Sequence, residues 1–238
     1  MLNSNAKYIN NRLALRPPQK ESLERFQQIC DILSLSKEPD LESELQKIKE
    51  LFPTLTSFER EFPSICFALA TGIGKTRLMG ALIAYLHYEK GVESFFVMAP
   101  NLTIYRKLKA DLGDPSNPKY VFRGLDKFVN PPRIIDGDNY EEFRQQTLFD
   151  TGIIINVFNI SKLNSESGRM RRLNEVLGQS YFAYLQALPD LCIFMALAYS
   201  ISYGIAAGFI FYCIVVKDLS RLGRNYIDTG KLCIFALL

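Results

Sequence analysis

A glycine-containing segment carries the residues whose types and spacing have the clearest chemical use. Residues 65–76 read Ile-Cys-Phe-Ala-Leu-Ala-Thr-Gly-Ile-Gly-Lys-Thr. Glycines let the backbone N–H groups of a loop curl around an anion, and the N-terminus of a following helix adds a partial positive charge. A lysine can reach terminal phosphates as a point charge, and a threonine hydroxyl can bind Mg²⁺. The segment therefore predicts a phosphate-binding P-loop.

Each residue of this P-loop has an expected role. Lys75 would contact the β- and γ-phosphates of a nucleoside triphosphate, and Thr76 would bind Mg²⁺. The remaining loop contacts would come from Thr71, Gly72, Ile73 and Gly74. The full P-loop pattern has a glycine six positions before the lysine, where this chain has Leu69. The alternative is a chance glycine turn ahead of a helix, which the strand and helix patterns on both sides disfavour.

The segments around the loop predict an α/β fold. An apolar run over 65–69 indicates a buried strand, and 75–88 has the period of a helix. Further strands are predicted over 94–99, 119–122, 152–158 and 191–195. Strands that alternate with helices are typical of a mostly parallel sheet, whose ligands bind at the carboxyl ends of the strands. We therefore expect a RecA-like P-loop domain.

The residues ahead of the loop predict a helical lead. Residues 1–17 are polar, and we expect them to be extended. One amphipathic helix is predicted to begin at Pro18 and another to cover Leu41 to Leu51. Both helices would cover one edge of the sheet.

Between the later strands we expect loops and one more helix. Residues 130–140 form a polar insertion, and Asp136-Gly137 suits a tight hairpin turn. A basic loop over 165–172 is predicted to lead into a helix that reaches Leu188. The predicted domains are a helical lead (1–60), an incomplete RecA-like domain (61–195) and a divergent apolar tail (196–238).

Composition is that of an ordinary globular protein, with 22% charged and 48% apolar residues. A net charge of +3 permits a nucleic-acid partner without requiring one. The beginning of the sequence lacks an apolar signal core, and we expect a cytoplasmic protein. The five cysteines are scattered and there is one histidine, which argues against a Cys/His zinc site. The cysteines are interpreted as free thiols in a reducing compartment.

Several segments together resemble one protein family. They are the P-loop, Leu15-Arg-Pro-Pro-Gln19, Ala99-Pro-Asn-Leu-Thr-Ile-Tyr105, Pro131-Pro-Arg-Ile-Ile-Asp-Gly-Asp-Asn-Tyr140 and Gly178-Gln-Ser-Tyr-Phe182. Over 12–195 the chain resembles the N-terminal part of the restriction (Res) subunit of type III restriction–modification enzymes, a superfamily 2 DEAD/DEAH-box-like helicase. The resemblance implies ATP and Mg²⁺ as cofactors, and DNA and a modification (methyltransferase) subunit as partners. In that family, ATP hydrolysis drives movement or switching on DNA before a separate nuclease domain cleaves it.

The resemblance also assigns roles to single residues. Gln19 matches the glutamine that reads the adenine edge, although an ordinary surface glutamine at a helix start is the alternative. Asn101, Thr103 and Lys107 match a segment that such helicases place against a nucleic-acid backbone. Asn159 and Lys162 match a second segment with which such helicases contact a nucleic-acid strand. For the Asn101 segment, the alternative is a capped surface helix with solvated charges.

The family pattern stops at its most informative motif. A P-loop ATPase needs a pair of acids at the end of a neighbouring strand, one for the Mg²⁺ shell and one to polarise water. The family has Asp-Glu-Ala-His after a strand like 191–195, whereas residues 196–199 here read Ala-Leu-Ala-Tyr. The second RecA-like domain and its arginine finger are also missing from these 238 residues. We therefore expect no intact catalytic site, and a truncated, hydrolysis-deficient lobe.

The apolar tail leaves three interpretations open. Residues 191–216 contain no charged side chain, and Lys217, Arg221 and Arg224 follow. The tail could be foreign sequence from about 196 onward, introduced by a frameshift or rearrangement. It could be a transmembrane helix that anchors a nucleotide-binding head to the inner membrane, since the run exceeds the roughly 18 residues that a span needs. The third interpretation is a buried strand plus a buried helix.

Overall fold

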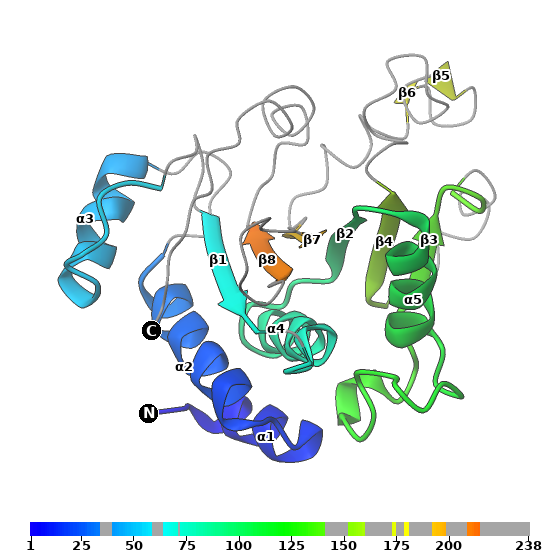
Figure 1. The fold of residues 1–238 in the computed structure, drawn as a ribbon, viewed down its shortest axis with the longest axis horizontal. Helices are drawn as coiled ribbons and strands as arrows, with labels where there is room; N and C mark the ends of the chain where they lie inside the picture. Colours follow the sequence, from blue (N-terminus) through cyan, green and yellow to red (C-terminus); the bar gives the residue numbers. More distant parts are fainter. Residues whose placement is uncertain are drawn as a thin grey trace, which may run out of the picture.

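The computed structural model describes residues 1–33, 40–58, 64–70, 72–140 and 152–159, and four later strand segments, 173–174, 179–180, 192–198 and 209–214. The helices are α1 (Ser4–Leu13), α2 (Pro17–Ile32), α3 (Leu41–Leu51), α4 (Lys75–Lys90), α5 (Leu102–Gly113) and the 3₁₀ turn η1 (Asp126–Phe128). The strands are β1 (Ser64–Leu69), β2 (Ser94–Ala99), β3 (Arg133–Asp136), β4 (Ile154–Asn159), β5 (Leu173–Asn174), β6 (Gln179–Ser180), β7 (Cys192–Ala198) and β8 (Phe209–Ile214). Figure 1 shows their arrangement.

A six-stranded sheet in the order β1-β8-β7-β2-β4-β3 organises the fold. Strands β7, β2, β4 and β3 are parallel to one another. Strand β8 is antiparallel to both β1 and β7, so β1 runs in the same direction as the parallel strands. The carboxyl ends of β1, β7, β2 and β4 therefore share one edge of the sheet, and the predicted α/β class is confirmed.

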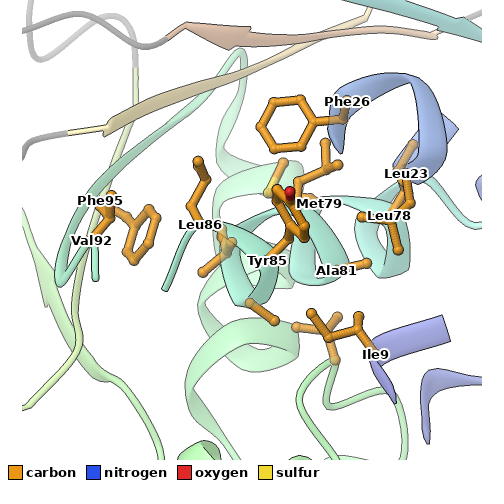
Figure 2. Close-up of a cluster of buried hydrophobic side chains, with 14 of the residues drawn as sticks. Ile9, Leu23, Phe26, Leu78, Met79, Ala81, Tyr85, Leu86, Val92 and Phe95 are labelled. Atoms are coloured by element: carbon orange, nitrogen blue, oxygen red, sulfur yellow. The ribbon is translucent and has the colours of Figure 1, made fainter. Parts of the chain in front are cut away.

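Helix α4 lies at the centre of the hydrophobic core. Its residues 78–86 are all buried, because other helices cover the faces that the sheet leaves open. Figure 2 shows Leu23 and Phe26 of α2 on one side of α4 and Ile9 of α1 on the opposite side. The ring of Phe26 meets that of Tyr85 edge to face, with centroids 5.9 Å apart. The connections β1–α4–β2 and β2–α5–β3 both move along the sheet toward its β3 edge, and right-handed crossovers in the same direction place α4 and α5 on the same face of the sheet.

The N-terminal prediction was wrong in one respect, because residues 4–13 form α1 instead of an extended segment. The Asn3 side chain accepts a hydrogen bond from the N–H of Ala6 at 2.8 Å and caps the helix. Ala6, Ile9 and Leu13 recur at helical spacing and are buried. The two predicted helices that follow are confirmed, as α2 and α3.

The strand predicted over 119–122 is also wrong, because these residues form turns. Tyr120, Val121 and Phe122 are buried, which explains their strand-like composition. The N–H of Val121 donates to the carbonyl of Asp111 on α5 at 2.9 Å, so it does not join a sheet ladder. A Cβ atom at Gly80 of α4 would lie 2.6 Å from Val121, so this apolar turn packs directly under α4.

The polar insertion over 130–140 contains an edge strand, β3, which pairs in parallel with β4. The hairpin predicted at Asp136-Gly137 is therefore wrong. The turn there is held by the Asp136 carboxylate, which accepts from the N–H groups of Asp138 at 2.7 Å and Asn139 at 3.1 Å. Within the helix predicted to reach Leu188, the described residues form a two-stranded antiparallel pair, β5 and β6.

The apolar run 191–216 contributes two strands to the main sheet. The strand predicted over 191–195 is confirmed as β7, which extends to Ala198, and β8 lies between β7 and β1. In the parts of the chain that the structure describes, no helix has both the length and the apolar character needed to cross a membrane.

Candidate nucleotide-binding site

The loop between β1 and α4 has the backbone geometry that its glycines predict. Gly72 and Gly74 have φ values of +80° and +92°, in the region that residues with a Cβ atom rarely adopt. Gly74 is the N-cap of α4, and its carbonyl accepts from the N–H groups of Arg77 and Leu78 at 3.0 and 3.1 Å. Thr71 lies outside the described residues. The loop thus delivers the chain directly into the first turn of α4, where helix N–H groups favour an anion.

Lys75 and Thr76 are the first two residues of α4, and both are half-buried. The Nζ atom of Lys75 donates to the carbonyl of Ala70 at 2.6 Å, across the loop. Burial lowers the pKa of the Lys75 ammonium from its ordinary value. Lys75, the predicted phosphate ligand, and Thr76, the predicted Mg²⁺ ligand, therefore both lie at the start of α4. This is the edge of the sheet at which the parallel strands end.

The junction between α1 and α2 is bonded to the two glycines of the loop. The Nε2 atom of Gln19 donates to the carbonyl of Gly74 at 2.8 Å, and Nη1 of Arg16 donates to the carbonyl of Gly72 at 3.1 Å. The Oε1 atom of Gln19 accepts from the N–H of Arg16 at 2.8 Å. Only 1% of the Gln19 side chain is exposed. Gln19 is therefore a buried link between α2 and the loop, and its reading of adenine stays a prediction.

The end of β7 lies in register with the end of β1 across β8. Leu69 is paired with Phe209, and Phe209 is paired with Ala198. Residues 196–198 thus form the stretch of β7 that lies level with the end of β1, with β8 between the two strands. In this chain that stretch reads Ala-Leu-Ala. Thr76, the predicted metal ligand, lies in the first turn of α4 at this edge.

Comparison with known proteins identifies the family. The family described as type III restriction enzyme, Res subunit, matches residues 12–186, which is more than half of the chain. The chain belongs to this family. It is 31% identical over 121 residues to the probable type III restriction-modification enzyme HindVIP Res subunit of Haemophilus influenzae. That alignment covers 47% of this chain and 22% of the relative, so the chain spans about a fifth of the relative's length. No solved structure matches.

The Res-subunit segment predicted to contact DNA begins at the same sheet edge as the P-loop. Asn101 caps α5, since its Oδ1 atom accepts from the N–H of Ile104 at 2.9 Å. Thr103 and Lys107 are exposed on α5. Asn159 pairs with Ala99 in the sheet register and is 5% exposed. Lys162 and the basic loop over 165–172 lie outside the described residues.

Two arginines were missed as site residues of this Res-family chain. Arg16 holds the carbonyl of Gly72, and Nη1 of Arg77 donates to the carbonyl of Leu13 at 3.1 Å. Arg16 is part of the Leu-Arg-Pro-Pro-Gln segment that carried the family resemblance, and its spacing of three from Gln19 at a helix start was an available signal. Arg77 had no such signal, because its partner is a backbone carbonyl 64 residues away in the sequence.

A second polar cluster lies between α5 and the β3 edge, away from the P-loop. Lys109 and the buried Asp136 form an ion pair. Burial alone would raise the pKa of Asp136, but the bond from Lys109 and the backbone N–H groups of the turn bring the pKa below its ordinary value. Burial alone would lower the pKa of Lys109, but the bond and the negative charge of Asp136 outweigh burial and raise that pKa above its ordinary value. The cluster fastens the edge strand to α5.

Proposed function

We propose that the chain is the ATP- and DNA-binding helicase-like lobe of a type III restriction enzyme Res subunit. The observation that carries this proposal is the loop between β1 and α4. Its glycines have positive φ values at positions 72 and 74, and Lys75 and Thr76 follow at the helix N-terminus. A loop of N–H groups, a lysine and a threonine fit a triphosphate and its Mg²⁺.

In this proposal each loop group has one task. Lys75 exchanges its bond to the Ala70 carbonyl for bonds to the β- and γ-phosphates, and Thr76 holds Mg²⁺ through its hydroxyl. Thr71, Gly72, Ile73 and Gly74 contribute the cradle. The Gln19 amide bonds to the N–H of Arg16 and to the carbonyl of Gly74, which leaves one N–H hydrogen and one oxygen lone pair. Gln19 favours adenine over guanine through these two remaining groups.

The same proposal places DNA on α5 and on the end of β4. Asn101, Thr103 and Lys107 would contact phosphates, together with Asn159 and Lys162, so binding is independent of sequence and sensitive to salt. Because these contacts go to phosphates and read no base, the affinity should lie in the non-specific range, about 10⁻⁴ M. A methyltransferase subunit would supply the recognition of a DNA site. We propose that the protein is cytoplasmic.

Binding of a fluorescent ATP analogue to the full chain tests the nucleotide site. Lys75→Ala should abolish binding, and Lys90→Ala, which removes a positive charge from the exposed far end of the same helix, should leave it unchanged. GTP should compete less well than ATP. Unchanged affinity in Lys75→Ala would remove the P-loop assignment, and equal competition by GTP would remove the role of Gln19.

A membrane-anchored nucleotide-binding protein is the second candidate, because the charge-free run 191–216 is followed by Lys217, Arg221 and Arg224. Two strands of the main sheet come from this run, which favours the first candidate. Fractionation of cells separates the two. Recovery of the protein in the soluble fraction, without detergent, supports the cytoplasmic lobe. Release of the protein from the membrane fraction only by detergent supports the membrane anchor.

A further inference from the structure

Helix α1 lies along α4 and is fastened to it at both ends. Near its start, Nδ2 of Asn3 donates to the carboxylate of Glu89 at 2.8 Å. At its end, the carbonyl of Leu13 accepts from Nη1 of Arg77 at 3.1 Å. Between the two bonds, Ile9 is fully buried against α4 (Figure 2). The two helices are thus antiparallel partners, and nearly all of α1 precedes the region 12–186 that the Res family matches.

The end of α1 is rigidly connected to the residues that hold the P-loop. Ala14 follows the helix with φ at +46°, a left-handed conformation that is unusual for a residue with a Cβ atom. The N–H of Leu15 donates to the carbonyl of Asn10 at 3.1 Å, which closes the turn. The next residue is Arg16, whose guanidinium is bonded to Gly72. A displacement of α1 would therefore be passed directly to the α1–α2 junction.

The bonds from this junction set the direction of loop N–H groups. In a planar trans peptide the carbonyl and the following N–H point in opposite directions. When Arg16 and Gln19 hold the carbonyls of Gly72 and Gly74, the N–H groups of Ile73 and Lys75 are turned away from the junction. Arg77 lies in the same helical turn as Lys75 and Thr76, so its bond to Leu13 ties the phosphate-binding turn to the same support.

We infer that α1 is a positioning element for the phosphate-binding loop, with Arg77 as the positioning residue that couples the two. The inference rests on the nucleotide binding proposed above. Neither Leu13 nor Asn3 is a candidate ligand of the nucleotide, and α1 acts on affinity by holding the loop in the conformation that receives phosphates. Loss of either fastening therefore weakens ATP binding, although only one of them is near the loop.

Binding of the fluorescent ATP analogue to full-length variants tests this inference. Arg77→Ala should weaken binding about tenfold, within the usual range of coupling between two sites. Arg77→Lys keeps a charged donor and should recover most of the loss. Glu89→Ala removes the other fastening, about 18 Å along the α4 axis from Arg77. It should weaken binding about threefold, whereas the loss of a negative charge alone would strengthen the binding of an anion.

Two controls make the outcomes distinct. Lys90→Ala removes a charge beside Glu89 without touching α1 and should bind as the unmodified chain does. Leu112→Ala removes a buried side chain of α5, and it should lower the melting temperature without weakening binding. If Lys75→Ala abolishes binding while Arg77→Ala and Glu89→Ala bind normally, the inference is overturned and the nucleotide site stands. If Lys75→Ala binds normally, both are overturned. Weakening by Leu112→Ala equal to that of Arg77→Ala would reduce the effect to general stability and overturn the inference.

Discussion

The Nζ atom of Lys75 donates to the carbonyl of Ala70 at 2.6 Å, so the lysine expected to meet phosphates is held against the beginning of its own loop. The side chain is half-buried, and that burial disfavours its charged form. A nucleotide that binds here must replace one carbonyl oxygen by phosphate oxygens of full negative charge. The exchange is favourable only while Lys75 carries its proton.

The affinity for ATP should therefore depend on pH through Lys75. Because its pKa is lowered, the proton is lost at a lower pH than in an ordinary lysine, whose pKa is about 10.4. Affinity should decline as pH rises toward the ordinary lysine pKa. In Lys75→Arg the side chain stays charged throughout this range, so any remaining affinity should be flatter with pH. Fluorescence titrations at several pH values measure both curves, and parallel curves would contradict the assignment.

The two loop glycines should respond differently to alanine. At Gly72 a Cβ atom would have nothing within 4 Å. Gly72→Ala should therefore lose only the roughly 1 kcal/mol of folding free energy that a φ of +80° costs a residue with a Cβ atom. At Gly74 the Cβ atom would lie 2.7 Å from Nε2 of Gln19, so Gly74→Ala must also displace that buried amide. We expect Gly74→Ala to be the less stable variant in urea unfolding and the weaker ATP binder. Equal losses in the two variants would show that the Gln19 contact is unimportant.

The elements that sequence alone predicted well have one dominant signal. Strand β2 has the predicted bounds, since six apolar or small residues between a glycine stop and a proline leave little choice. Helix α1 was missed because only Ala6, Ile9 and Leu13 mark its face among polar residues. Strand β8 could not be separated from the rest of the apolar tail, because a continuous apolar run has no period that distinguishes strand from helix.

The candidate site was predictable only in part, for a related reason. Glycine, lysine and threonine of the P-loop are neighbours in the sequence, so their spacing reveals them. The bonds of Arg16 to Gly72 and Arg77 to Leu13 join residues 56 and 64 positions apart, and they follow from the packing of α1 and α2 on α4. Local patterns carry no signal for such contacts.

The ion pair of Lys109 and Asp136 should make stability depend on pH. Because the pKa of Asp136 is lowered, its charge stabilises the fold above the ordinary aspartate pKa of about 3.9, and this contribution is lost as pH falls through the lowered value. Asp136→Asn should reduce the free energy of unfolding by about 1–2 kcal/mol at pH 7, and by less in acid. Urea unfolding at pH 7 and pH 3 measures the difference. Glu50→Gln, at an exposed position of α3, is the control, and an equal loss at both pH values would refute the role of the pair.

Hydrolysis of ATP should fail because of the residues that end β7. Ala198 lies level with Leu69 across β8, and residues 196–198 read Ala-Leu-Ala where the family resemblance implies a metal-binding acid and a water-orienting acid. Positioning and charge stabilisation supply nearly all of phosphoryl-transfer catalysis, so the loss of both acids should be severe. We therefore expect ATP binding without turnover above background, with or without DNA.

Phosphate release by the purified 238-residue chain measures this directly. The double variant Ala196→Asp with Leu197→Glu places two acids at the end of β7, but it should recover little activity, because two acids do not by themselves supply the positioning and charge stabilisation that phosphoryl transfer needs. Lys75→Ala provides the background rate, since it should not bind the nucleotide. DNA-stimulated phosphate release by the unmodified chain, above the rate of Lys75→Ala, would mean that other residues supply the acids and that the end of β7 is not the catalytic position.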